Sequence, residues 1–199
     1  MNADFNTALQ QTKNVSVIWK KADGIAPDDV TSKMDKAMLD WMVQLTECLQ
    51  IWIKKGFTMT EGELILARTN LGAIVESWLK LFYCIYYDDF KKQSPYRYRG
   101  GSKKGTQIEP EDLKFSNLED FSTGIFWDTT QDAEYQWVDR IRKTRNAIHS
   151  FNYKDIGDTY DFINDLDIFY AFVAHVYSSL PPLEDCLETM PEGYVPCKM

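Results

Sequence analysis

Residues 60–90 read TEGELILARTNLGAIVESWLKLFYCIYYDDF, and this stretch decides the fold class. Thr60 and Glu63 have the spacing of a capping box, in which each side chain bonds the backbone N–H of the other residue, so a helix is expected to begin here. The apolar face widens near Tyr86 and Tyr87, which predicts that this helix is central. Apolar side chains recur every three or four residues, as on one face of an α-helix: Leu64, Ala67, Leu71, Ile74, Trp78, Leu81 and Ile85.

A second helix is expected before this one, from Asp28 or Asp29 to Lys55. Either aspartate can cap its start, and Gly56 follows two lysines at its end, where cations complement the negative end of the helix. Its apolar stripe, at steps of three and four residues, comprises Met34, Met38, Trp41, Leu45, Cys48 and Trp52.

Two more long helices are expected at residues 130–150 and 158–180. The last one has Asp158 as a cap and is stopped by Pro181-Pro182. Four long helices with short or moderate joins predict an all-α fold, an antiparallel helical bundle with short accessory helices. The expected division is an N-terminal segment at 1–27, a helical bundle at 28–182 with an inserted basic loop at 91–106, and an irregular tail at 183–199.

Composition limits the function classes. The 199-residue chain is 44% hydrophobic and can bury a core, but its net charge of −8 argues against a sequence-blind nucleic-acid coat, which needs dense positive charge. The four cysteines lack metal-ligand spacing and the chain has two histidines, so no metal and no cofactor are expected. Glu76 and Lys80 interrupt the most apolar run, and no signal peptide is visible. We expect a cytoplasmic protein without membrane contact.

The stretch RIRKTRNAIH, residues 140–149, carries the candidate chemistry. On a continuous helix, Arg142, Arg145, Asn146 and His149 lie at positions i, i+3, i+4 and i+7 and share one face. Guanidinium groups can bind phosphate oxygens in a fork, an amide can orient a substrate, and an imidazole can transfer protons near neutral pH. The cluster therefore predicts a phosphate-handling site, and the alternative is a solvated helix face beside the core.

These residues resemble the HEPN signature, Arg-x(4–6)-His on a helix of an all-α domain. Arg142 and His149 leave six residues between them, which fits the pattern, whereas Arg145-Asn146 resembles the Arg-Asn step of the family but leaves three. Which arginine is the motif arginine therefore stays open. The resemblance implies a metal-independent endoribonuclease, of a kind often found as a toxin or phage-defence effector.

The same resemblance implies roles for the cluster. His149 would be the general acid or base, Arg142 or Arg145 would bind the phosphate, and Asn146 would orient the substrate. The product would carry a 2′,3′-cyclic phosphate. Two such helices would meet in a homodimer, because one histidine serves only one of the two proton-transfer roles. The implied partners are RNA, a second copy of the chain, and an antitoxin or regulatory protein.

Further residues are candidates for binding RNA. Tyr153 could stack on a base or pack at the helix end, and the loop at 91–106 could guide RNA or be a solvated loop. The candidate loop cations, interleaved with tyrosines, are Arg97, Arg99, Lys103 and Lys104. His175 lies on an apolar helix and is expected to be a satisfied structural histidine.

Two other functions compete with the nuclease. One is a catalytically silent HEPN-like bundle that binds a nucleotide or a partner protein, and the other is a helical interaction module with tryptophan-rich faces. A dimer that brings two copies of His149 together would favour the nuclease. A monomer, or an inward-facing His149, would favour the others.

Overall fold

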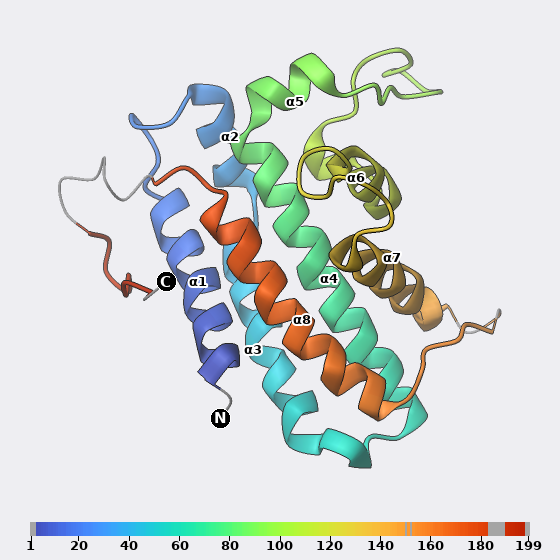
Figure 1. Cartoon of the computed structure of the whole chain (residues 1–199). Helices are drawn as coiled ribbons and strands as arrows, with labels where there is room; N and C mark the ends of the chain where they lie inside the picture. Colours follow the sequence, from blue (N-terminus) through green and yellow to red (C-terminus); the bar gives the residue numbers. More distant parts are fainter. Residues whose placement is uncertain (1–2, 150, 152, 183–189, 198–199) are drawn as a thin grey trace.

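The computed structural model describes residues 3–149, 151, 153–182 and 190–197. Within this part of the chain it contains eight α-helices and two isolated β-bridges but no sheet, so the all-α helical bundle is confirmed (Figure 1). No helix in the described ranges combines the length and apolar character needed to cross a bilayer. The helices are α1 (Ala3–Trp19), α2 (Asp28–Lys36), α3 (Leu39–Lys55), α4 (Glu61–Ile85), α5 (Tyr87–Gln93), α6 (Phe115–Ser122), α7 (Ala133–Arg145) and α8 (Thr159–Ser178).

The central helix is α4, which packs against α3, α7 and α8, and α1 completes the bundle by packing against α3 and α8 (Figure 1). Thr60 and Glu63 form the predicted capping box at its start. Successive helices α1, α3 and α4 alternate in direction, and α8 runs parallel to α4. Every predicted position of the apolar face of α4 is buried: Leu64, Ala67, Leu71, Ile74, Trp78, Leu81 and Ile85.

The sequence pattern leaves residues 1–27 outside the bundle, but α1 packs against α3 and α8. Phe5 and Ile18 are buried in this contact. Asn14 is buried as well, and its side-chain amide donates to the carbonyl oxygen of Val195 at 2.7 Å. A buried polar side chain such as Asn14 interrupts the regular spacing of apolar residues that predicts a buried helix. Its partner is 181 residues away, so neighbouring residues in the sequence do not indicate the contact.

The helix expected at residues 28–55 is two helices. The backbone is extended at Ala37, where α2 ends, and α3 starts after Met38. No glycine or proline marks this break, so the predicted stripe runs through it. The break changes the phase of the helix, so that Met38 and Trp41 are 62% and 63% exposed. The buried face of α3 instead consists of Leu39, Met42, Thr46 and Leu49.

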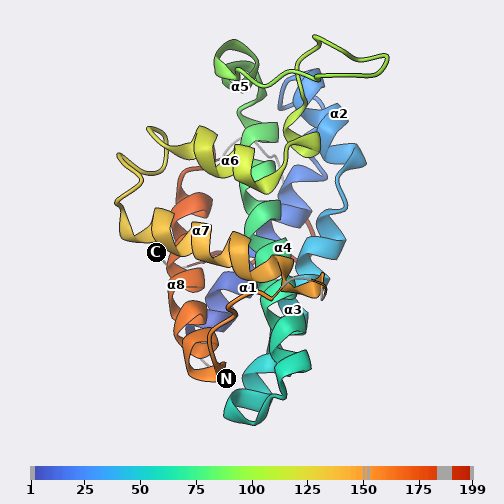
Figure 2. The same ribbon diagram turned by 90° about the vertical axis from the view of Figure 1, so that its right-hand side faces the viewer.

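The helix that carries the candidate chemistry, α7, is shorter than the expected 130–150. It ends at Arg145 and is followed by a 3-10 turn, Asn146–Ile148. It also lies across α4 instead of running along the bundle (Figure 2). The last turn of α7 therefore meets the side of the central helix.

Candidate functional site

A glycine allows α7 to approach α4 closely. A Cβ atom built on Gly72 would lie 2.6 Å from Cβ of Arg145, a distance that real Cβ atoms do not tolerate. The Thr69 hydroxyl donates to the carbonyl oxygen of Ile65 at 2.8 Å and also lies 3.3 Å from the carbonyl oxygen of Arg145. Because Gly72 has no side chain, Arg145 can lie directly against the backbone of α4.

A cleft opens beside this crossing, with a volume of about 310 Å³. Three of the four predicted residues, Arg142, Arg145 and Asn146, line it. The remaining lining residues come from α4 and from the start of α6: Glu76, Lys114, Phe115 and Ser116. The arginines and the asparagine are therefore brought together as expected, whereas the other four residues were not identified from the sequence.

Arg142 is held by two carboxylates. Its Nε donates to Glu119 on α6, and its Nη2 donates to Asp139 one turn earlier on α7. Burial raises the pKa of the Glu119 carboxyl, and the hydrogen bond from Arg142 offsets this only in part. The edge of the guanidinium that would grip a phosphate is already occupied.

Arg145 has a looser attachment. Among the residues that the structure describes, its one carboxylate partner is Glu76, which accepts from Nη1 and also binds Lys80 at 3.2 Å. The guanidinium carbon lies 5.6 Å from the ring centre of Phe115. Because guanidinium has five N–H donors, its Nε and Nη2 edge stays available, with no acceptor among the residues that the structure describes.

The assumption of one continuous helical face is wrong at Asn146. The α-helix ends at Arg145, and Asn146 begins the 3-10 turn. Asparagine is a poor residue for a helix interior because its side chain competes for backbone hydrogen bonds, which accounts for the early end. His149 follows the turn, is exposed, and does not line the cleft that contains the arginines.

Exposed aromatic side chains follow His149. Phe151 is fully exposed and Tyr153 is 89% exposed, so Tyr153 does not pack into the bundle. Residues 150 and 152 lie outside the described residues. Tyr153 is a candidate from the sequence and Phe151 is not, although both follow the same histidine within four residues.

The basic loop is separate from this cleft. Lys91 and Lys92 belong to α5, and the following segment forms a small hairpin around an antiparallel bridge between Arg97 and Gln107. It projects from the α5 end of the molecule in both ribbon views (Figures 1 and 2). None of the four predicted loop cations, Arg97, Arg99, Lys103 and Lys104, lines the cleft.

Two of the cationic side chains of the hairpin, Arg97 and Lys103, contact other groups of the same chain. Arg97 donates to the backbone carbonyl oxygens of Ser94 and Tyr96, at 2.8 and 2.9 Å. Lys103 lies 4.0 Å from Asp112 and 5.2 Å from the ring centre of Tyr98. Within the described part of the chain, Arg97, Arg99 and Lys104 have no acidic partner, so most of the positive charge of the hairpin is not compensated by a carboxylate.

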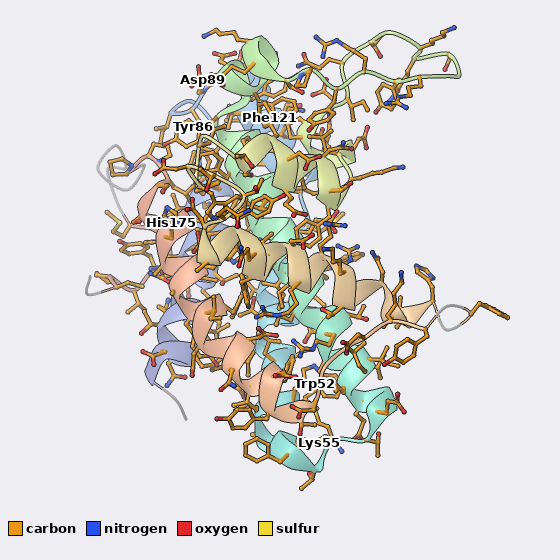
Figure 3. The ribbon with its side chains drawn as sticks, turned by 45° about the vertical axis from the view of Figure 1, so that its right-hand side comes forward. Trp52, Lys55, Tyr86, Asp89, Phe121 and His175 are labelled. Atoms are coloured by element: carbon orange, nitrogen blue, oxygen red, sulfur yellow. The ribbon has the colours of Figure 1, made fainter. Side chains whose placement is uncertain are left out.

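The second histidine is far from the cleft. The Nδ1 atom of His175 lies 2.8 Å from the carboxylate of Glu134, beside the first turn of α7 (Figure 3). Glu134 and Arg145 are eleven residues apart on α7, which at about 1.5 Å per residue places them roughly 16 Å apart. His175 is a satisfied histidine, as expected, and does not complete the site around Arg145.

Comparison of the chain with family models, curated proteins and solved structures finds no significant match.

Proposed function

We propose that the chain is a metal-independent endoribonuclease of the HEPN type, acting as a toxin or defence effector. One observation carries the proposal: Arg142, Arg145 and Asn146 line a single cleft, and the exposed His149 follows within one 3-10 turn. Lys114 adds a third cation to the cleft wall. This set of groups fits a phosphodiester, whose charge the cations stabilise.

The proposed reaction is attack of an RNA 2′-hydroxyl on the adjacent phosphorus. A base removes the hydroxyl proton, an acid protonates the leaving 5′-oxygen, and the P–O bond to the next nucleotide breaks. The products are a 2′,3′-cyclic phosphate and a 5′-hydroxyl. His149 fills one proton-transfer role, and His149 of a second copy fills the other, since His175 lies too far away.

The second copy is expected to dock at the end of α7. Phe151 and Tyr153 are exposed there, together with Ile148, which is 43% exposed. Apolar side chains that flank an incomplete site suit a symmetric contact, in which both copies contribute the same surface. The two clefts then join into one composite site, which holds one His149 from each chain.

Cleavage without metal is the primary test. The purified chain is expected to cut single-stranded RNA in EDTA and to leave 2′,3′-cyclic phosphate ends, because the proposed groups supply every proton and charge that the reaction needs. Mass spectrometry of the fragments identifies these ends. A requirement for a divalent ion, or 3′-hydroxyl ends, would contradict the proposal.

A second candidate function has its own support. Arg142 and Arg145 are both paired with carboxylates of the same chain, an arrangement that also suits a catalytically silent bundle. Such a bundle would bind a nucleotide or partner protein at the same cleft. Binding of RNA without any cleavage in the test above would favour this candidate.

The two arginines are expected to differ in the cleavage assay. Arg145→Lys should slow cleavage roughly 10- to 100-fold, because lysine keeps the charge but loses the fork that two or more charge-assisted bonds need. Arg142→Lys should slow cleavage less and lower the unfolding temperature more, since the Nε and Nη2 atoms of Arg142 already bind Glu119 and Asp139. Single-turnover rates and thermal melts measure the two effects. Normal cleavage by Arg145→Lys with an inactive Arg142→Lys would reverse this order.

A further inference from the structure

Helices α2 and α3 lie beside α4 (Figure 2). Residues of these three helices line an apolar groove. Its volume is about 300 Å³. The floor is formed by buried side chains, mainly Met34, Leu39, Met42, Leu81 and Cys84. These residues come from all three helices, so the groove is built by their junction and is distinct from the arginine cleft.

The break between α2 and α3 keeps this groove open. Met38 and Trp41, both largely exposed, stand at its mouth. Single exposed apolar residues are ordinary, but here two large ones border a concave apolar floor. Methionine side chains are flexible and polarisable, which suits a surface that closes around an aliphatic chain.

Lysines surround the mouth of the groove. Lys33 binds two carboxylates, Glu109 at 2.7 Å and Glu111 at 3.0 Å, and Glu111 also lines the groove, so this part of the rim has no excess positive charge. Lys80 shares the carboxylate of Glu76 with Arg145. Lys36 is exposed and, within the described residues, has no acidic partner.

Positive charge in excess of the carboxylates is therefore confined to the part of the rim that Lys36 and Lys80 form. Lys36 leaves one unpaired positive charge beside an apolar floor, in a chain whose net charge is −8. Two cations, Lys80 and Arg145, share the single carboxylate of Glu76. A ligand with an apolar tail and one negative group complements both features of this site.

We propose that the groove binds a single-chain anionic amphiphile, a fatty-acid-like carboxylate. Its tail lies on the methionine-rich floor under Trp41, and its carboxylate lies between Lys36 and Lys80. The volume is at the lower end of the roughly 300–1,000 Å³ of small-molecule sites, which fits one aliphatic chain. A globular protein partner would bury about 800 Å² of this chain and would have to contact much surface outside the groove.

Three probes with the same tail test the head group. Calorimetric titration of the full chain uses decanoate, 1-decanol and decyltrimethylammonium, each below the concentration at which it forms aggregates. Decanoate is expected to bind at least tenfold more tightly than the other two. Octanoate should bind roughly tenfold more weakly than decanoate, because each methylene removed from water adds a constant increment. Equal affinity for the three decyl probes, or no binding of decanoate, would overturn the proposal.

A charge reversal and its matched control locate the carboxylate. Lys36→Glu is expected to weaken decanoate binding about tenfold, whereas Lys21→Glu, at an exposed site outside the groove, should leave it unchanged. Both variants change the net charge equally. An equal loss in both variants, or none in Lys36→Glu, would contradict the assignment of the head group.

The tail position has an independent optical readout. Decanoate should shift the fluorescence emission of the wild-type chain to shorter wavelength, since the tail covers the exposed indole of Trp41. Trp41→Phe should lose this shift while still binding decanoate in the calorimeter. A shift that persists in Trp41→Phe would place the tail elsewhere and overturn the proposal.

Discussion

His149→Ala is expected to reduce RNA cleavage in EDTA by roughly 100-fold or more, the scale of losing a general acid–base group. The reason is geometric as well as chemical. Of the two histidines in the chain, only His149 lies at the end of α7 that carries Arg145, and its side chain is exposed to a substrate. Single-turnover rates with saturating enzyme separate this loss from any change in RNA affinity.

The other histidine supplies the control for this experiment. His175→Ala removes an imidazole from α8, beside the far end of α7, where His175 binds Glu134 and contacts Phe126. That variant should cleave RNA at the wild-type rate if it stays folded, which circular dichroism verifies. Unchanged cleavage by His149→Ala would assign the activity to another site or to a contaminant.

Assembly is part of the same prediction, since one copy of His149 per cleft serves one proton-transfer role. The specific activity should fall on dilution as dimers separate, and light scattering should report a dimer at the concentrations that cleave. His149→Ala should dimerise like the wild type, because its loss removes a proton carrier and leaves Ile148, Phe151 and Tyr153 in place. An active monomer would rule out the two-chain site.

Local signals in the sequence identify helix ends well. Thr60 with Glu63, and Asp158 at the start of α8, form capping boxes in the structure, and Gly56 ends α3 with a positive φ. Each signal depends on residues within one turn of each other, so the printed sequence contains all the information. The break at Ala37 has no such signal, so the apolar stripe predicted across it is wrong for Met38 and Trp41.

The candidate site illustrates the same limit. The spacing of Arg142, Arg145 and Asn146 places them in one cleft, but their partners depend on tertiary packing. Glu76 is visible in the sequence only as an interruption of an apolar run, and Glu119 lies in a short helix with no evident role. The sequence also does not show that α7 crosses α4 at Gly72, the contact that positions Arg145.

Arg68→Met is expected to lower the free energy of unfolding by about 3–5 kcal/mol, the usual effect of removing one partner from a buried ion pair. Arg68 and Asp165 are each 1% exposed and bind one another between α4 and α8. The Nε of Arg68 also donates to the carbonyl oxygen of Ile156 at 3.1 Å. Methionine fills much of the volume of the arginine side chain. The carboxylate of Asp165 and the carbonyl oxygen of Ile156 both lose their guanidinium donor.

Asp165 also accepts a hydrogen bond from Arg140 on α7, which offers a matched control. The side chain of Arg140 is 50% exposed, so Arg140→Met removes a solvated partner of the same carboxylate and should cost about 1 kcal/mol or less. Urea unfolding of both variants measures the difference. A similar loss of unfolding free energy in both variants would show that the burial of Arg68 does not make its removal more destabilising than that of Arg140.

The double variant Arg68→Met with Asp165→Leu separates the charge from the packing. Replacing both members of a buried pair by apolar residues removes the unpaired charge that makes the single variant unstable, so much of the lost stability should return. In that case the main role of the pair is to position the helices and not to add net stability. Asp165 on α8 binds Arg68 on α4 and Arg140 on α7, so it links all three helices. If so, the double variant should be folded but slower in RNA cleavage, since α7 carries the arginines of the cleft. A double variant as unstable as Arg68→Met alone would contradict this account and place the lost stability in packing.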